Sequence, residues 1–213
     1  VKRIVRRLTT KKRKQIITGM RRSGRYVPMI TKMLLEEGMP RDLVFMVPAE
    51  SNFNVSARSH KSAVGLWQFI ASTGRIYGLK INRWIDERRD PVLATKAAIK
   101  YLKHLYGLFG DWELAMAAYN TGEGRVERAI KRAKRRGMKH NYSSLRLPRE
   151  TRNYVPAIMA MAVIYKNPAR YGLGHVRPIQ AMDETKASLP VSFSLEEVAQ
   201  RSKMSFRLLR DKN

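Results

Sequence analysis

Apolar residues recur along much of the chain three and four positions apart, the spacing that places them on one face of an α-helix. The segments 26–35 and 93–105 show this pattern clearly. Helix signals bracket both segments: Gly38 follows the first, while Asp90 and Pro91 precede the second as an N-cap acceptor and a first-turn proline. Because similar segments follow one another along the sequence, we expect an all-α fold.

The helix expected after Gly38 is apolar and ends close to an acidic residue, Glu50. It opens at Arg41 and carries the apolar run 43–47, and Pro48 bends or ends it just before Glu50. A carboxylate beside such a run is shielded from water, which raises its pKa and keeps the proton on near neutral pH. A retained proton is what a general acid needs, although an isolated glutamate in this position is more often only a helix-end residue.

The stretch after Glu50 combines small, hydroxylated and aromatic residues. Its four serines are Ser51, Ser56, Ser59 and Ser62. The sequence Gly-Leu-Trp-Gln follows at positions 65–68. Glycine permits close approach of the backbone, Trp67 offers a flat aromatic ring, and the Gln68 amide both donates and accepts hydrogen bonds. Such a set suits a polar, ring-shaped ligand such as a sugar.

The segment from Glu50 to Gln68 resembles the signature of the lytic transglycosylase family, the lysozyme-like enzymes that cut bacterial peptidoglycan. That signature reads Glu-Ser-x-Phe-x-Pro-x-Ala-x-Ser-x-x-Gly-Ala-x-Gly-Leu-(Met/Trp)-Gln. The residues that match it in register are Glu50, Ser51, Phe53, Ala57, Ser59, Ala63, Gly65, Leu66, Trp67 and Gln68. Val55 stands where the family usually has proline, and Ser62 where it usually has glycine. Both departures lie in the intervening loop, so they concern loop shape more than chemistry.

Two later segments resemble the same family. The first is Ala-Tyr-Asn-Thr-Gly at positions 118–122, with a threonine where alanine is usual. The second is Arg-Glu-Thr-Arg-Asn-Tyr-Val at positions 149–155, in which Glu150 and Tyr154 share one face of a helix. From the residues alone, Tyr119 is more often a core tyrosine, Asn120 a helix cap, and Glu150 a partner for neighbouring arginines.

The resemblance implies a lysozyme-like catalytic domain over residues 23–172 and a single-acid mechanism. Protonated Glu50 would donate to the oxygen that links N-acetylmuramic acid to N-acetylglucosamine, and would then accept the proton of the C6 hydroxyl as a 1,6-anhydro ring closes. The residues implied to bind and orient the glycan are Ser59, Gln68, Tyr119, Asn120, Glu150 and Tyr154. No metal or cofactor is implied, and a chain without cysteine has no thiolate metal site.

Two alternatives remain open from the sequence. Goose-type lysozymes share the expected fold and a similar catalytic glutamate, but hydrolysis needs a second carboxylate to activate water. The candidates for that second carboxylate are Glu150 and Asp86. The other alternative is a binder of cell wall or nucleic acid that keeps the fold without turnover.

Charge bears on the choice of partner. The chain carries 43 Lys and Arg against 17 Asp and Glu, a formal net charge of +26 that attracts polyanions. Charge alone favours nucleic acid, but the signature moves the prediction to peptidoglycan glycan strands. Few aromatic residues accompany the basic block 124–137, which weakens a base-stacking role. We expect a monomer whose basic segments contact anionic wall polymer or a membrane surface.

The ends of the chain are expected to lie outside the catalytic domain. Residues 1–22 are strongly basic, and they are predicted as either a solvated, frayed arm or an amphipathic helix that binds membrane or wall. Residues 173–213 are predicted as a connector with short helices, one of which opens with a capping box at Ser194 and Glu197. They resemble the connector of the membrane-bound D-type branch more than a helix-turn-helix, for which they carry too little core.

The expected location is the periplasm, the cell envelope or the exterior. No signal peptide is visible in the sequence, so the export route stays open. No apolar run approaches the roughly 18 residues of a membrane span.

Overall fold

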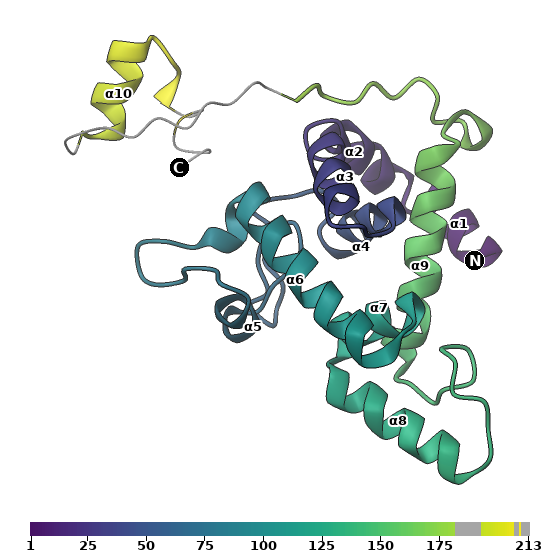
Figure 1. Ribbon diagram of the computed structural model, residues 1–213. Helices are drawn as coiled ribbons and strands as arrows, with labels where there is room; N and C mark the ends of the chain where they lie inside the picture. The colour runs from purple at the N-terminus through teal and green to yellow at the C-terminus, as the bar shows by residue number, and fades with distance from the viewer. Residues whose placement is uncertain (182–192, 207–208, 210–213) are drawn as a thin grey trace. The chain divides into compact units, whose positions relative to one another are not determined.

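The computed structural model describes residues 1–181, 193–206 and 209. The described part is helical, with isolated β-bridges and no strand within those residues, which confirms the expected all-α fold (Figure 1). The α-helices are α1 (Lys2–Thr9), α2 (Arg13–Ser23), α3 (Val27–Glu36), α4 (Met46–Glu50), α5 (Ala71–Ile76), α6 (Pro91–Phe109), α7 (Trp112–Thr121), α8 (Glu123–Arg135), α9 (Arg149–Lys166) and α10 (Leu195–Ser202). The 3₁₀ helices are η1 (Arg41–Phe45), η2 (Glu87–Arg89) and η3 (Ala169–Tyr171).

The chain divides into two compact units, Val1–Ala181 and Met182–Asn213. The first unit includes the basic N-terminal segment, which was expected to lie apart from the catalytic domain. Its helices α1 and α2 bury one apolar face in the common core through Val5, Leu8, Ile16 and Met20. The basic residues occupy the opposite, solvated face, so this segment forms amphipathic helices and not a frayed arm, while its binding to membrane or wall stays a prediction.

Helix α2 is also fixed to the far end of the first unit. The Arg13 guanidinium donates hydrogen bonds to the carbonyl oxygens of Tyr171, at 3.1 Å, and Gly172, at 2.6 Å. Helix α1 packs against α9. These contacts bring the N-terminal segment against residues near position 170, so one continuous core extends beyond the predicted boundaries at residues 23 and 172.

Helix α6 begins where the sequence predicts. The Asp90 carboxylate accepts hydrogen bonds from the backbone N–H groups of Val92 and Leu93, both at 2.8 Å. The Asp111 carboxylate caps α7 in the same way by accepting from Leu114 N–H at 2.8 Å. Between the two helices Gly110 adopts a left-handed conformation with φ of 63°, which ends α6 and lets α7 fold back against it.

Helix α9 is the element on which the others converge. It packs against α1, η1, α4 and α7, and Figure 1 shows it running beside α4 and α7 (Figure 1). Its buried face includes Tyr154, Val155, Ile158 and Ile164. Helices from the beginning, middle and end of the first unit therefore meet along α9.

The second unit contains α10, which opens with the predicted capping box. The Ser194 hydroxyl accepts from Glu197 N–H at 3.1 Å, and the Glu197 carboxylate accepts from Ser194 N–H at 2.8 Å. Of the connector predicted over residues 173–213, positions 182–192, 207–208 and 210–213 lie outside the described residues. Across the described residues of both units, no helix has the length and hydropathy needed to cross a membrane.

Candidate active site

Glu50 lies at the end of a buried helical segment. The 3₁₀ helix η1 and helix α4 together bury every residue from Leu43 to Pro48, and Glu50 is the last residue of α4, with a half-buried side chain. The next residue, Ser51, donates a hydrogen bond from its hydroxyl to Leu66 O at 2.8 Å. This bond ties the end of α4 to the loop that follows it. The backbone beside Glu50 is therefore held by the buried helix before it and by the loop after it.

The Glu50 carboxyl meets a tyrosine from α9. Tyr154 is buried, and its phenolic hydroxyl donates a hydrogen bond to Glu50 Oε1. Burial raises the pKa of Glu50 to about 7 from a usual 4.5; the Tyr154 hydrogen bond opposes this rise, and the negative charge of Glu150 adds to it. As the sequence predicted, this carboxyl keeps its proton to near neutral pH, which suits a general acid.

Ser59 and Gln68 shape the loop between α4 and α5. Ser59 Oγ accepts from Ala63 N–H at 3.0 Å. Gln68 Nε2 donates to Gly65 O at 2.9 Å and to Ala57 O at 3.2 Å, and its backbone adopts a left-handed φ of 51°. Both side chains therefore use hydrogen-bonding capacity within the loop, and their binding of a glycan stays a prediction.

The same loop closes over Arg88, which no sequence pattern singled out. The Arg88 side chain is buried and donates to Ser62 O at 3.0 Å and to Phe69 O at 3.1 Å. Its guanidinium also makes a two-pronged ion pair with Asp86, both bonds 2.8 Å long. Gly65 lies against its backbone, because a Cβ at Gly65 would sit 1.8 Å from Arg88 O. Arg88 in the run Glu87-Arg88-Arg89 carries no sequence signal that separates it from solvated neighbours.

This ion pair changes the interpretation of Asp86. The hydrogen bond from Arg88 holds the pKa of Asp86 below its usual range, and both carboxylate oxygens are engaged by Arg88. A carboxylate with a lowered pKa is a weaker base, so the ion pair argues against Asp86 as the carboxylate that activates water in a hydrolytic mechanism.

Trp67 does not present its ring to a ligand. The side chain is fully buried, and Nε1 donates to Thr95 Oγ1 at 3.0 Å. The expectation that this ring offers a flat surface to a sugar was therefore wrong. The sequence could not distinguish a buried Trp67 from a half-exposed Gln68, because a loop has no regular period.

Tyr119 and Asn120 connect α7 to both sides of the Glu50 site. The Tyr119 hydroxyl donates to Trp67 O at 2.8 Å, which links α7 to the loop. Burial, and then the charge of Glu50, raise the pKa of Tyr119 well above its usual 10. Asn120 Oδ1 accepts from Thr151 Oγ1 at 2.9 Å, which links α7 to the first turn of α9.

An aromatic cluster that sequence reasoning missed lies beside Tyr119. Tyr101 of α6 contacts Tyr119 and Tyr77, with ring centroids 5.2 and 4.7 Å apart, and Phe69 lies 6.1 Å from Tyr119. The Tyr101 hydroxyl donates to Glu123 Oε2 at 3.2 Å, while burial raises the pKa of Tyr101. Tyr101 lies within the segment 93–105, whose helical spacing predicted an apolar face but not an aromatic cluster.

Glu150 lies at the exposed start of α9, one turn before Tyr154. Its charge acts on Glu50, so it is near the site, although its own side chain faces solvent. The structure thus gathers Glu50, Tyr119 and Tyr154 most closely, with Asn120 and Glu150 at the junction of α7 and α9. Within the described ranges, no three His, Asp or Glu side chains are grouped as metal ligands would be.

The chain is similar to known proteins over much of its length. Residues 28–142 match the family model described as the transglycosylase SLT domain, which is more than half of the chain. The chain belongs to this family. The SLT match contains Glu50, Ser59, Gln68, Tyr119 and Asn120, while Glu150 and Tyr154 follow it on α9.

Individual relatives agree with the SLT assignment. The chain is 44% identical over 174 residues to membrane-bound lytic murein transglycosylase D of Escherichia coli (strain K12), a match that covers 81% of this chain and 38% of the relative. It is 29% identical over 186 residues to peptidoglycan transglycosylase gp16 of Escherichia phage T7, covering 86% of this chain and 13% of that one. The chain therefore spans less than two fifths of the length of either relative.

A solved structure resembles the helical fold described above. An inactive mutant of lytic transglycosylase Slt from Pseudomonas aeruginosa superposes with a TM-score of 0.52 at 25% sequence identity. The match covers 67% of this chain and 24% of that one. The lysozyme-like helical fold implied by the signature is thereby confirmed.

Proposed function

We propose that this domain cleaves the β-1,4 bond between N-acetylmuramic acid and N-acetylglucosamine in peptidoglycan, with Glu50 as the single acid and base. The observation that carries the proposal is the state of Glu50, a carboxyl whose pKa rises to about 7 and which is held by Tyr154. Membership of the transglycosylase SLT family and the names of its relatives supply the substrate class.

The reaction follows from one carboxyl that changes its protonation state twice. Protonated Glu50 donates its proton to the glycosidic oxygen, and the bond from that oxygen to the muramic acid C1 breaks. The C6 hydroxyl of the same sugar then attacks C1, and its proton returns to the Glu50 carboxylate. Atoms and protons balance without water, and the product carries a 1,6-anhydro ring.

The surrounding side chains support the two roles of Glu50. The Tyr154 hydroxyl donates to Oε1 and fixes the orientation of the carboxyl, and its hydrogen bond favours the anion that remains after the first proton transfer. Burial favours the neutral acid before that transfer. A pKa near the working pH lets one group serve as donor and then as acceptor.

Substrate contacts are proposed for the residues around this carboxyl. Asn120 and Glu150 flank the site from the junction of α7 and α9, and Tyr119 borders it from α7. Gln68 and Ser59 would act through the loop, either by direct contact or by holding its shape. We propose a location in the cell envelope, in keeping with a substrate that lies there and with a relative named as membrane-bound.

Mass spectrometry of peptidoglycan digests tests the proposal. Wild type should release muropeptides lighter by one water molecule than hydrolysis products, while Glu50→Gln should release none. Glu36→Gln, which removes an exposed carboxylate on α3, is the matched control and should match wild type. Products with free reducing ends would show hydrolysis and point to Glu150 for water activation. Undiminished activity of Glu50→Gln would overturn the assignment.

A further inference from the structure

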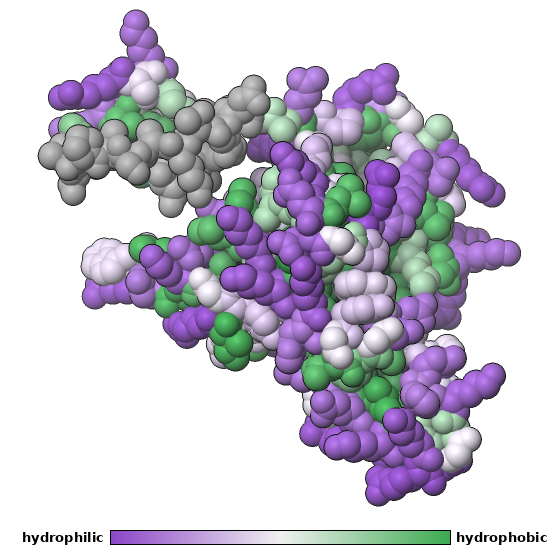
Figure 2. Space-filling view, in the orientation of Figure 1, coloured by the Kyte–Doolittle hydropathy of each residue, from purple (hydrophilic) through white to green (hydrophobic). Residues whose placement is uncertain are grey.

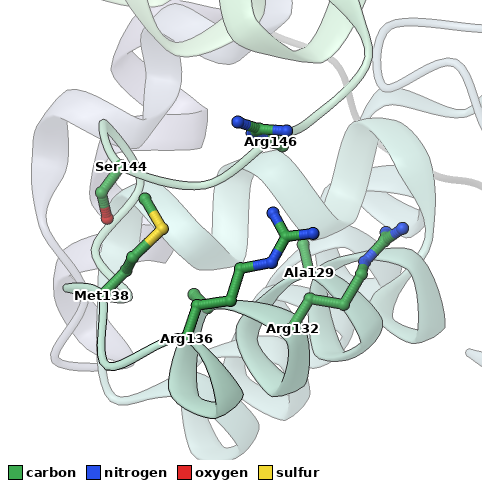
Figure 3. A pocket seen from close by; sticks show the side chains of 7 residues that line it. Ala129, Arg132, Arg136, Met138, Ser144 and Arg146 are labelled. Carbon is green, nitrogen blue, oxygen red and sulfur yellow. The ribbon is translucent and has the colours of Figure 1, made fainter.

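A pocket of about 110 Å³ lies at the far end of α8, between the last turns of the helix and the segment that returns to α9. Figure 3 shows Arg132 in the last turns of α8, Arg136 directly after the helix ends, and Arg146 above them on the returning segment, with Met138 and Ser144 at the side (Figure 3). This volume is several times what one water molecule needs, so a compact anionic group fits. Glu123, the first residue of α8, accepts a hydrogen bond from Tyr101 of the aromatic cluster, and the helix rise separates it from Arg136 by roughly 20 Å.

The returning segment holds Arg146 over the pocket by anchoring its neighbours. Leu145 and Leu147 are buried in the core, so the residue between them is directed outward. Tyr142 reinforces the anchor, because its hydroxyl donates to Thr151 O at 2.8 Å. The position of Arg146 is thus fixed by packing on both sides.

None of the three arginines has a carboxylate partner among the described residues. The ion pairs found in the described part of the chain involve Lys32, Lys103, Lys166 and Arg88 as the cations. Arg132 donates from Nε to the carbonyl oxygen of Arg128 at 3.3 Å, which leaves its terminal nitrogens available to a ligand. Three positive side chains that line one pocket repel one another, and an anion between them would convert that repulsion into attraction.

We propose that this pocket binds a single phosphate group, either free or as a small ester such as glycerol phosphate. A phosphate carries about 1.5 to 2 negative charges and three strong acceptor oxygens, and guanidinium forks match such oxygens in pairs. A carboxylate has one charge and two oxygens, which a single arginine already satisfies. Three arginines therefore match phosphate better than carboxylate.

The end of α8 weakens the site less than the arginines strengthen it. A helix C-terminus carries a partial negative charge of about half a unit, which repels an anion. Here the last carbonyl groups are already engaged, because Gly137 N–H donates to Lys134 O and Met138 N–H to Ala133 O, both at 3.0 Å. The three full positive charges outweigh what remains of the helix dipole. Figure 2 shows hydrophilic side chains over much of the α8 surface (Figure 2).

Calorimetric titration with inorganic phosphate, at constant ionic strength set by chloride, tests the site. We expect saturable binding of one phosphate per chain. Arg136→Gln and Arg146→Gln should each weaken it about tenfold or more, since each loses hydrogen bonds to a charged group. Arg135→Gln removes the same charge from the same helix turn outside the pocket, and it should change the affinity less than about twofold.

Other outcomes would overturn the proposal. Binding that does not saturate, or an equal loss in Arg135→Gln, would reduce the pocket to a general basic surface. Circular dichroism and thermal unfolding should show that the exposed variants keep the wild-type fold. Peptidoglycan digestion by Arg136→Gln should proceed as in wild type, so a failure here leaves the assignment of Glu50 untouched.

A second set of titrations identifies the source of the phosphate. Vesicles containing phosphatidylglycerol should bind wild type more tightly than Arg146→Gln, and soluble glycerol phosphate should displace them, if the ligand is a lipid headgroup. Equal vesicle binding by the two proteins, together with Arg146-dependent binding of glycerol phosphate, would identify a soluble or polymer-borne ester. Either result supports the phosphate site, and the absence of Arg146-dependent binding in both arms would refute it.

Discussion

Tyr154 donates its hydroxyl hydrogen bond to Glu50 across 104 residues of sequence. The bond joins the second turn of α9 to the last residue of α4. Glu50 begins the first of the three segments that resemble the family, and Tyr154 lies in the last of them. It opposes the rise in pKa that burial causes in Glu50, so the carboxyl is balanced between two effects of opposite sign. This balance places its titration near neutral pH.

Tyr154→Phe should shift the pH dependence of activity. Without the hydrogen bond the pKa of Glu50 rises further, so the protonated acid persists and the alkaline limb of the rate profile moves to higher pH. The maximal rate should fall roughly ten- to a hundredfold, because a hydrogen bond to a charged group is lost. The profile is measured as the initial rate of glycan cleavage between pH 5 and 9.

The control for this change is Tyr165→Phe on the same helix. The Tyr165 hydroxyl is buried and has no hydrogen-bond partner among the described residues, so its removal should leave both rate and pH profile as they are. Stability should stay level or rise by up to about 1 kcal/mol, because an unsatisfied polar group is removed. An alkaline limb that stays in place in Tyr154→Phe would contradict the proposed balance.

Glu50 should make the protein less stable as the pH rises. Its folded pKa of about 7 lies above the usual 4.5, so folding stabilises the protonated form, and that contribution is lost as the pH passes from 4.5 through 7. The loss is at most about 3 kcal/mol, because each tenfold change in the proton affinity of a group corresponds to about 1.4 kcal/mol. Glu50→Gln lacks this titration.

Denaturant unfolding of wild type and Glu50→Gln at pH 5 and pH 8 measures the effect. The difference in free energy of unfolding between the two proteins should move in favour of Glu50→Gln by about 1–3 kcal/mol from the lower to the higher pH. All other titrating groups are shared, so they cancel in the comparison. A difference that does not change with pH would mean that Glu50 titrates near its usual value.

The helices and the acid were predictable because local chemistry marks them. Asp90 caps its helix as expected, and the apolar run before Glu50 is buried; burial raises the pKa of Glu50. Caps and apolar periods act over a few residues, so a single sequence contains them. The resemblance to a known signature then predicted the lysozyme-like fold into which these helices assemble.

The packing of the loop and of the N-terminal helices was not predictable in the same way. Periodicity shows that α1 and α2 have an apolar face, but it does not show that this face meets α9 and the residues near position 170. Trp67 and Arg88 are buried by contacts with elements distant in sequence, and nothing in their immediate neighbours marks either one. Such contacts become visible only when the chain is folded.

Ser62→Gly should stabilise the loop. Ser62 has a left-handed backbone with φ of 58°, at the position where the family usually has glycine. Glycine adopts this conformation without strain, and we expect a gain of about 0.5–1 kcal/mol in the free energy of unfolding with unchanged activity. The control is Ser56→Gly, an exposed loop position outside the left-handed region, which should lose about 0.5 kcal/mol. Equal effects of the two changes would mean that the φ of Ser62 carries no strain.

Gly65→Ala should damage both the fold and the site. Gly65 has a φ of 86°, and an added Cβ would lie 1.8 Å from Arg88 O, so the backbone of the loop or of η2 must move. We expect a loss of about 2–4 kcal/mol, from strain and overpacking together, and a large loss of activity as Gln68 and Trp67 shift. Unfolding in denaturant and glycan cleavage at matched folded fractions separate the two effects.

The matched substitution is Gly107→Ala in α6. Apart from the nearby backbone of α6 itself, no atom of the structure lies within 4 Å of its added Cβ, and the position is helical, so alanine should stabilise the protein by about 0.5–1 kcal/mol. Opposite signs for the two glycines would show that the close approach of Gly65 to Arg88 holds the loop in place. If Gly65→Ala instead kept wild-type stability and activity, the loop could not be fixed by this contact, and Gln68 would owe its position to its own hydrogen bonds to Gly65 and Ala57.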